Sequence, residues 1–175
     1  MSLGTLADST ASSARVTWPA WGLWWAEANI TDPAELGGRQ ALTIAGTAFS
    51  GTKVAGGAFD GRASYRFVAG AGGVNKSLPQ KSYVNAAGVA LANVLSDAAR
   101  EAGETLVTAG ITTRLGGHYA RKEGETLGDL LQRHYPQGWY CDADGTIRIG
   151  TRAATTYECE APRTRVDVAG AVVDL

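Results

Sequence analysis

Apolar and polar residues alternate in the first part of the chain, and this pattern constrains the fold more than any other feature. In the segment 23–30 the even-numbered residues are Trp, Ala, Ala and Ile, whereas Glu27 and Asn29 fall on the opposite side of an extended backbone. Asp32-Pro33 marks the end of this strand. Because period-two alternation is typical of strands with one buried face, the region 16–69 is predicted to be β-rich.

Further strands are expected within this region. The segments 41–49, 51–54 and 64–69 are rich in β-branched, aromatic and small apolar residues. Asp60-Gly61 lies between Phe59 and Arg62, and both turn residues tolerate the positive φ angles of a tight hairpin turn. The sequence therefore predicts a hairpin at this point, with 64–69 as its return strand.

Helical periodicity begins only after residue 82. Apolar residues recur at three- and four-residue steps in the segment 83–104, which ends near the stop signal Gly103. A second, shorter helix is predicted from the N-cap Thr126, with Asp129 forming part of a capping box, up to Pro136.

Strands follow the second helix. A hairpin is expected over 139–149, and final strands are expected at 157–160 and 165–174. The order of β-rich region, helix, helix and β-rich region predicts an α+β fold. We expect curved antiparallel sheets or barrels with two helices, rather than a doubly wound parallel sheet.

The same patterns divide the chain into four parts. Small and polar residues fill the segment 1–17, which is expected to be a flexible or docking N-terminal arm. A first β-rich lobe is predicted at 18–82, a connecting helix at 83–104, and a second α+β lobe at 105–175.

Composition excludes several classes of protein. The 175 residues carry 16 Lys and Arg against 17 Asp and Glu, so the net charge is −1, which provides no field to hold nucleic acid or an anionic membrane, and no sequence-specific nucleic acid binding is expected. Apolar runs are too short for a transmembrane segment, and the N-terminus has no signal-peptide pattern. Two cysteines, Cys141 and Cys159, are too few for a disulfide scaffold and fit a reducing cytosol.

A glycine-rich loop over 70–77 is the most tempting motif for chemistry. It has the glycine, lysine and serine of a phosphate-binding loop, but Asn75 replaces the second glycine and Pro79 interrupts the helix that should follow. Nucleotide binding by an enzyme stays an alternative. The favoured interpretation is a shaped loop in which glycines permit unusual backbone angles or close contacts, at Gly70, Gly72 and Gly73.

Other chemistry finds little support in the sequence. His118 and His134 are far apart and lack metal-ligand spacing, and Asp142 and Asp144 fit a hairpin turn better than a calcium loop. Cys141 is expected to be a small buried hydrophobic residue in a strand. We therefore expect no catalytic, metal or cofactor site, and a protein that is not an enzyme.

Tryptophan is concentrated near the start of the chain. Four of the five tryptophans lie within eight positions, where Pro19 and Gly22 prevent a helix. Aromatic side chains bury large areas in core and interface alike. Core packing and a subunit interface are both open, and the interface hypothesis assigns contact roles to Trp18, Trp21, Trp24 and Trp25.

The order of these features resembles the tail and baseplate hub proteins of tailed bacteriophages, including the late control D-type proteins. The resemblance covers most of residues 18–152 and includes the Trp-rich entry, Phe59-Asp60-Gly61-Arg62, the glycine loop and Asp142-Ala143-Asp144-Gly145. Such hubs are typically homotrimers with barrel domains that mimic the tail tube. Hub proteins are usually much longer than this chain, so the resemblance leaves direct spike binding open.

The resemblance implies a structural role in the virion. The chain is expected to form part of a hub that continues the tail tube towards the spike and surrounds the DNA channel. Expected partners are tube, distal tail, spike or tape-measure proteins, with assembly in the host cytoplasm. The alternative is a glycan- or protein-binding module, because the segment 124–131 resembles the start of a LysM domain near 124–140.

Overall fold

The protein is described by a computed structural model that covers residues 4–6, 9–31, 36–44, 46–152, 165–167 and 171–174. Its strands and helices, in chain order, are β1 (Gly4–Leu6), β2 (Ser9–Trp18), β3 (Trp25–Thr31), β4 (Arg39–Ile44), β5 (Thr47–Phe59), β6 (Arg62–Ala69), β7 (Lys81–Val84), α1 (Leu91–Ala102), β8 (Thr105–Leu106), β9 (His118–Arg121), α2 (Leu127–His134), β10 (Trp139–Cys141), β11 (Thr146–Ile149), β12 (Arg165–Asp167) and β13 (Ala171–Asp174).

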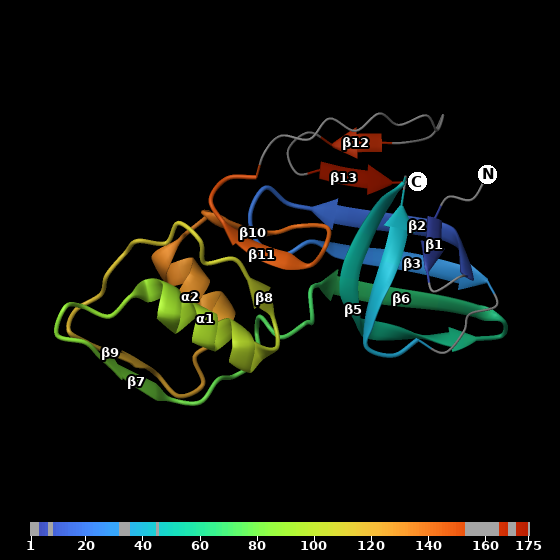
Figure 1. Ribbon diagram of the computed structural model, residues 1–175. Helices are drawn as coiled ribbons and strands as arrows, with labels where there is room; N and C mark the ends of the chain where they lie inside the picture. The colour runs from blue at the N-terminus through green and yellow to red at the C-terminus, as the bar shows by residue number, and fades with distance from the viewer. Residues whose placement is uncertain are drawn as a thin grey trace.

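Eight strands form one curled antiparallel sheet. Their order is β1-β4-β5-β6-β3-β2-β13-β12, and β1 pairs with β2 as well as with β4. This double pairing closes β1, β4, β5, β6, β3 and β2 into a ring, which Figure 1 shows on the right. The predicted α+β fold with a curved antiparallel sheet and two helices is confirmed.

The inner face of the ring is apolar. In β3, Ala26, Ala28 and Ile30 are buried and the residues between them are more exposed, as the alternation predicted. Phe67 of β6 and Leu42 of β4 are buried in the same hydrophobic core. The period-two pattern therefore supplies the side chains that fill the barrel.

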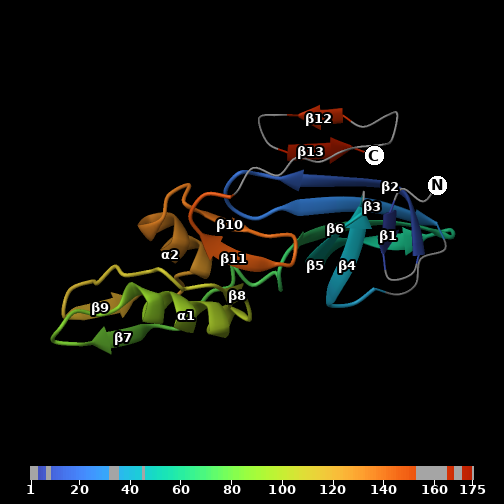
Figure 2. The same ribbon diagram turned by 45° about the horizontal axis from the view of Figure 1, so that its top comes forward.

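A second lobe packs its two helices beside small sheets (Figure 1, left; Figure 2). A three-stranded sheet has the order β10-β11-β8, with β11 and β8 parallel, and β7 pairs with β9 in a separate ribbon. The buried faces of α1 and α2 contribute Leu91, Val94, Leu95, Ala98, Leu127, Leu130 and Leu131.

The N-terminal segment differs from the expected flexible or docking arm. Residues of the segment 1–17 form β1 and most of β2, and β2 pairs along its length with β3. At its other edge, β2 pairs with β13 through the stretch Arg15–Trp18. The last strands of the expected second lobe, 105–175, thus belong to the large sheet.

Two boundaries also differ from the sequence-based expectation, and a third expectation lies outside the described residues. The connecting helix expected over 83–104 begins at Leu91, because the chain first forms β7 and then a turn in which Gly88 has φ 89°. The segments expected as separate strands at 41–49 and 51–54 divide instead around Gly46, which has φ 78°. The strand expected at 157–160 lies outside the described residues.

Candidate assembly surfaces

Two of the four clustered tryptophans join the lobes. Trp18 ends β2 and Trp24 precedes β3, and their indole N–H groups donate to backbone carbonyls of the hairpin formed by β10 and β11. The Trp18 Nε1 lies 3.1 Å from the carbonyl oxygen of Cys141, and the Trp24 Nε1 lies 2.9 Å from that of Asp142. These two tryptophans therefore attach the barrel to the β10–β11 hairpin of the second lobe.

Trp24 belongs to the core. Its side chain is fully buried, and its ring meets Phe49 edge-on at 5.3 Å between ring centroids. The ring leaves no surface for a partner, so the prediction of a subunit contact is wrong for Trp24. Trp18 contacts the same Phe49 ring at 5.2 Å and is partly buried.

Arg152 completes the joint between the lobes. Its guanidinium lies 4.2 Å from the Trp18 ring centroid and 5.0 Å from that of Tyr140. It also donates to the carbonyl oxygens of Pro19, at 2.9 Å, and Cys141, at 2.6 Å. A planar guanidinium suits this site because it stacks on aromatic faces while its N–H groups point outward in the plane.

We expect Arg152→Ala to lower the free energy of unfolding by about 2 kcal/mol, because two charge-assisted hydrogen bonds and two cation–π contacts disappear together. Arg152→Lys keeps the charge but not the planar fork, so it should recover less than half of the loss. Urea denaturation followed by tryptophan fluorescence measures both. Equal stability of the lysine variant and the unchanged protein would contradict the stacked geometry.

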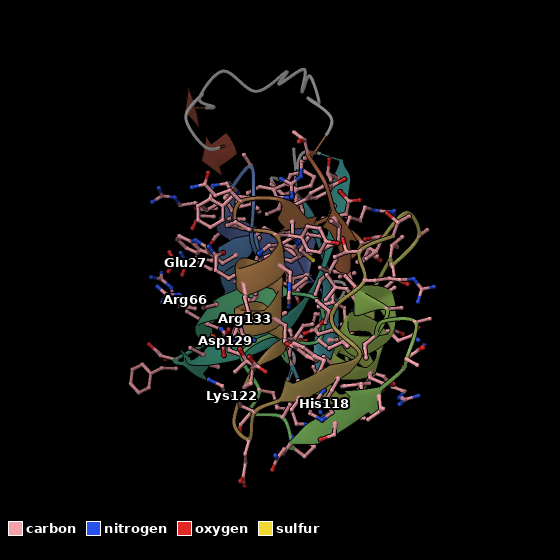
Figure 3. The ribbon with its side chains drawn as sticks, turned by 90° about the vertical axis from the view of Figure 1, so that its left-hand side faces the viewer. Glu27, Arg66, His118, Lys122, Asp129 and Arg133 are labelled. Carbon is pink, nitrogen blue, oxygen red and sulfur yellow. The ribbon has the colours of Figure 1, made fainter. Side chains whose placement is uncertain are left out.

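Trp21 and Trp25 both have solvent-exposed surface that a partner could contact. Trp21 is 45% exposed in the connection before β3. Trp25 is half-buried on the outer face of the sheet, where the Arg66 guanidinium lies 5.5 Å from its ring centroid. Arg66 also pairs with Glu27 at 2.5 Å, and Figure 3 shows these two side chains next to each other. Contact roles for Trp21, Trp25 and Trp18 stay predictions.

The glycine loop holds a carboxylate of the same chain. Gly70 and Gly72 have φ of 69° and 79°, which a side chain would strain. The backbone N–H groups of Ala71 and Gly73 donate to the two oxygens of Glu104, at 2.9 and 2.6 Å. Glu104 is buried, so this anion-binding turn is already filled. That occupancy argues against the nucleotide-binding alternative.

The LysM-like segment surrounds a shallow polar hollow of about 480 Å³ beside α2. Figure 3 shows Lys122, Asp129 and Arg133 on this side of the molecule. The capping box is present as predicted, since the Asp129 N–H donates to the Thr126 hydroxyl and the Thr126 N–H donates to the Asp129 carboxylate. The Thr126 N–H and the Thr126 hydroxyl both donate to the Asp129 carboxylate; these bonds lower the pKa of Asp129 and leave the carboxylate engaged with its own helix.

The sequence analysis missed Phe59, which is the most exposed aromatic side chain among the residues that the structure describes. Phe59, at the end of β5, is 88% exposed, and Val54 in the same strand is 54% exposed. Both lie on the hairpin of β5 and β6, which extends past the paired part of β4. The Asp60-Gly61 turn predicted the hairpin but gave no sign that its end would lie outside the core.

The histidine, cysteine and acidic residues that the sequence analysis considered for metal binding or catalysis form no such site among the described residues. Among the described residues no group of three or more His, Cys, Asp and Glu side chains has a metal-binding arrangement. Burial raises the pKa of the Cys141 thiol to about 12, so this thiol stays protonated at neutral pH and is a poor nucleophile.

No helix in the described part of the chain is long and apolar enough to span a bilayer.

Two solved structures share this fold. The tail protein from Neisseria meningitidis MC58 superposes with a TM-score of 0.62 at 17% identity, covering 85% of this chain and 50% of that one. The 43 kDa tail protein of prophage MuSo2 from Shewanella oneidensis gives a TM-score of 0.63 at 14% identity, covering 94% of this chain and 61% of that one. This chain thus spans about half to three-fifths of their length. Neither a protein-family model nor a curated protein matches the sequence.

Proposed function

We propose that this chain is a structural component of a bacteriophage tail, located in the virion. One observation carries the proposal: both described neighbours are tail proteins, and the shared fold covers 85% and 94% of this chain. The proposed role is architectural and requires no catalysis or cofactor. Its partners are other tail proteins.

Within the tail, we assign the chain to the hub that continues the tube towards the spike. A homotrimer would surround the DNA channel, because a closed ring requires cyclic symmetry. Assembly would take place in the host cytoplasm. Support comes from the order of motifs, which resembles hub proteins, and from the small closed barrel.

The electrostatics of the outer sheet face are compatible with a channel wall. Glu27 and Arg66 neutralise each other across β3 and β6, and the whole chain has a net charge of −1. A surface that retained DNA would need unpaired cationic groups along the phosphate backbone. A near-neutral wall lets DNA pass without holding it.

The test is to purify tail particles from the strain that encodes the chain and to quantify the chain by mass spectrometry. We expect a fixed ratio to the tube protein. A Trp21→Ala and Trp25→Ala double variant should incorporate at least tenfold less while its circular dichroism stays unchanged. Absence of the chain from tails would overturn the proposed function. Normal incorporation of the double variant would remove only the contact roles of these tryptophans.

The glycan- or protein-binding alternative is favoured by the hollow beside α2, since it lies in the LysM-like segment. Lys122, Glu123, Asp129 and Arg133 line it with charge, and its lining contains no aromatic ring on which a sugar could stack. Sedimentation with purified peptidoglycan separates the two functions. Retention by peptidoglycan, lost in a Lys122→Ala and Gln132→Ala variant, would favour the alternative.

A further inference from the structure

The far half of β5 has an unpaired edge. β4 pairs with β5 only up to Thr52, and a bulge follows between Lys53 and Ala55. From Lys53 to Phe59 the strand pairs with β6 on one side, and no described strand lies on its other side. A bulge bends the strand that carries it, and beyond this one no described strand pairs with the second side of β5.

The turn of the hairpin decides which backbone groups face outward. Asp60 and Gly61 have φ of 50° and 67°, which is typical of a two-residue type I′ turn. The closing pair of such a turn, Phe59 with Arg62, exchanges hydrogen bonds within the hairpin, and the pairs then alternate. Ala58 therefore directs its N–H and C=O groups to this edge, whereas Gly56, with φ 105°, departs from regular strand geometry.

Edge strands are protected against strand addition by charges, proline and bulges, and on β5 Lys53 and the bulge protect only the start of the edge. The six residues from Val54 to Phe59 include no charged residue and no proline, and all are exposed. The outer edges of β7 and β9, unpaired among the described strands, are each only four residues long, and β7 carries Lys81. The far half of β5 is longer and uncharged, and the exposed Phe59 ring ends it.

The same sheet has a second open edge at its other end. The strand order ends at β12, whose outer side is unpaired among the described strands. β12 and the far half of β5 lie on opposite sides of the sheet in both ribbon views (Figures 1 and 2). One chain thus has two such edges on opposite sides of one sheet, which is the arrangement that head-to-tail association of identical copies requires.

We propose that the edge Lys53–Phe59 of β5 is where a strand of a second copy of this chain adds to the sheet. Backbone hydrogen bonds through Ala58 supply the pairing, and Phe59 becomes buried against the neighbour. The biological role of this pairing rests on the proposed function, because a hub is a ring of identical copies. The edge pairing itself is testable without any tail.

Ala58→Pro provides the test. Proline removes the N–H that faces the open edge but leaves the hydrogen bonds between β5 and β6, and proline is tolerated on edge strands. Ala58→Ser, which keeps the N–H, is the matched control. Light scattering on a sizing column should show oligomers for the unchanged chain and for Ala58→Ser, and monomers for Ala58→Pro at the same concentration.

Circular dichroism and the melting temperature check that each variant folds. If Ala58→Pro fails to fold, Ala58→Lys, which places a charge at the edge, replaces it with the same expected loss of oligomers. A monomeric unchanged chain, or an Ala58→Pro variant that associates normally, overturns the edge pairing. A chain that associates through this edge but is absent from tail particles overturns the proposed function alone.

Discussion

Trp24→Ala is expected to lower the free energy of unfolding by about 4 kcal/mol, in the range measured for large aromatic residues removed from cores. The Trp24 ring is fully buried and meets Phe49 edge-on. The variant also leaves the Asp142 carbonyl without its 2.9 Å hydrogen bond from the indole. Because the ring contacts the barrel and its N–H reaches the second lobe, both lobes should lose stability in one transition. Urea denaturation, followed by circular dichroism, measures the loss.

Two further variants separate the contributions. Trp24→Phe keeps most of the ring volume and loses the hydrogen bond, so we expect a loss of about 1–2 kcal/mol. Trp25→Ala is the matched control, because Trp25 is the next residue but lies half-buried on the outer face. Its loss should stay within about 1 kcal/mol, as for exposed sites. Equal losses at the two positions would contradict the division of the cluster into core and surface.

The alternation of apolar and polar residues correctly predicted which residues of β3 are buried inside the barrel. The same pattern failed in β2, where a bulge interrupts the alternation. In β3 every second residue is buried, so the pattern is visible in the sequence. In β2 the register shifts between Ala11 and Ser13, and the buried residues are Ala11, Ala14 and Val16. Their spacing of three and then two has no single period. Together with the many Ser and Thr residues, this made a central strand look like a flexible arm.

Helical spacing misled the analysis at the start of α1. Val84 and Ala87 continue the apolar pattern of the helix towards the N-terminus, yet Val84 is in β7 and is exposed. The turn closes when the Gly88 N–H donates to the Asn85 carbonyl at 2.8 Å. Pairing of β7 with β9 depends on residues more than thirty positions away. Local periodicity carries no information on such pairing.

The candidate assembly surface was hidden for a related reason. Phe59 has the residue type of a core strand, and in a short hairpin it would be expected to face the core. It is exposed because β5 continues past the last residue that β4 covers. Where a barrel ends depends on the pairing of all its strands, so the sequence of one hairpin cannot show which of its residues lie beyond the core.

Glu104→Ala is expected to lower the free energy of unfolding by about 3 kcal/mol, because two N–H groups lose their acceptor at a buried site. The donors are the backbone N–H groups of Ala71 and Gly73, and the latter bond is buried. Their loss should loosen the glycine loop where it meets the end of α1. Glu104→Gln keeps one carbonyl oxygen as an acceptor, so roughly half of the loss should return. Thermal and urea denaturation of the three proteins give the comparison.

Formate distinguishes a lost hydrogen-bond acceptor from a lost side-chain volume. A carboxylate small enough to enter the vacated site can accept from the same two N–H groups, so formate should raise the melting temperature of Glu104→Ala well above its effect on the unchanged protein. Glu123→Ala, at an exposed glutamate beside α2, is the control that should show neither the loss nor the rescue. A destabilised Glu104→Ala protein that does not respond to formate, acetate or phosphate would mean that Glu104 acts mainly by filling space. In that case the glycines would shape the loop for close chain contact rather than for holding an anion.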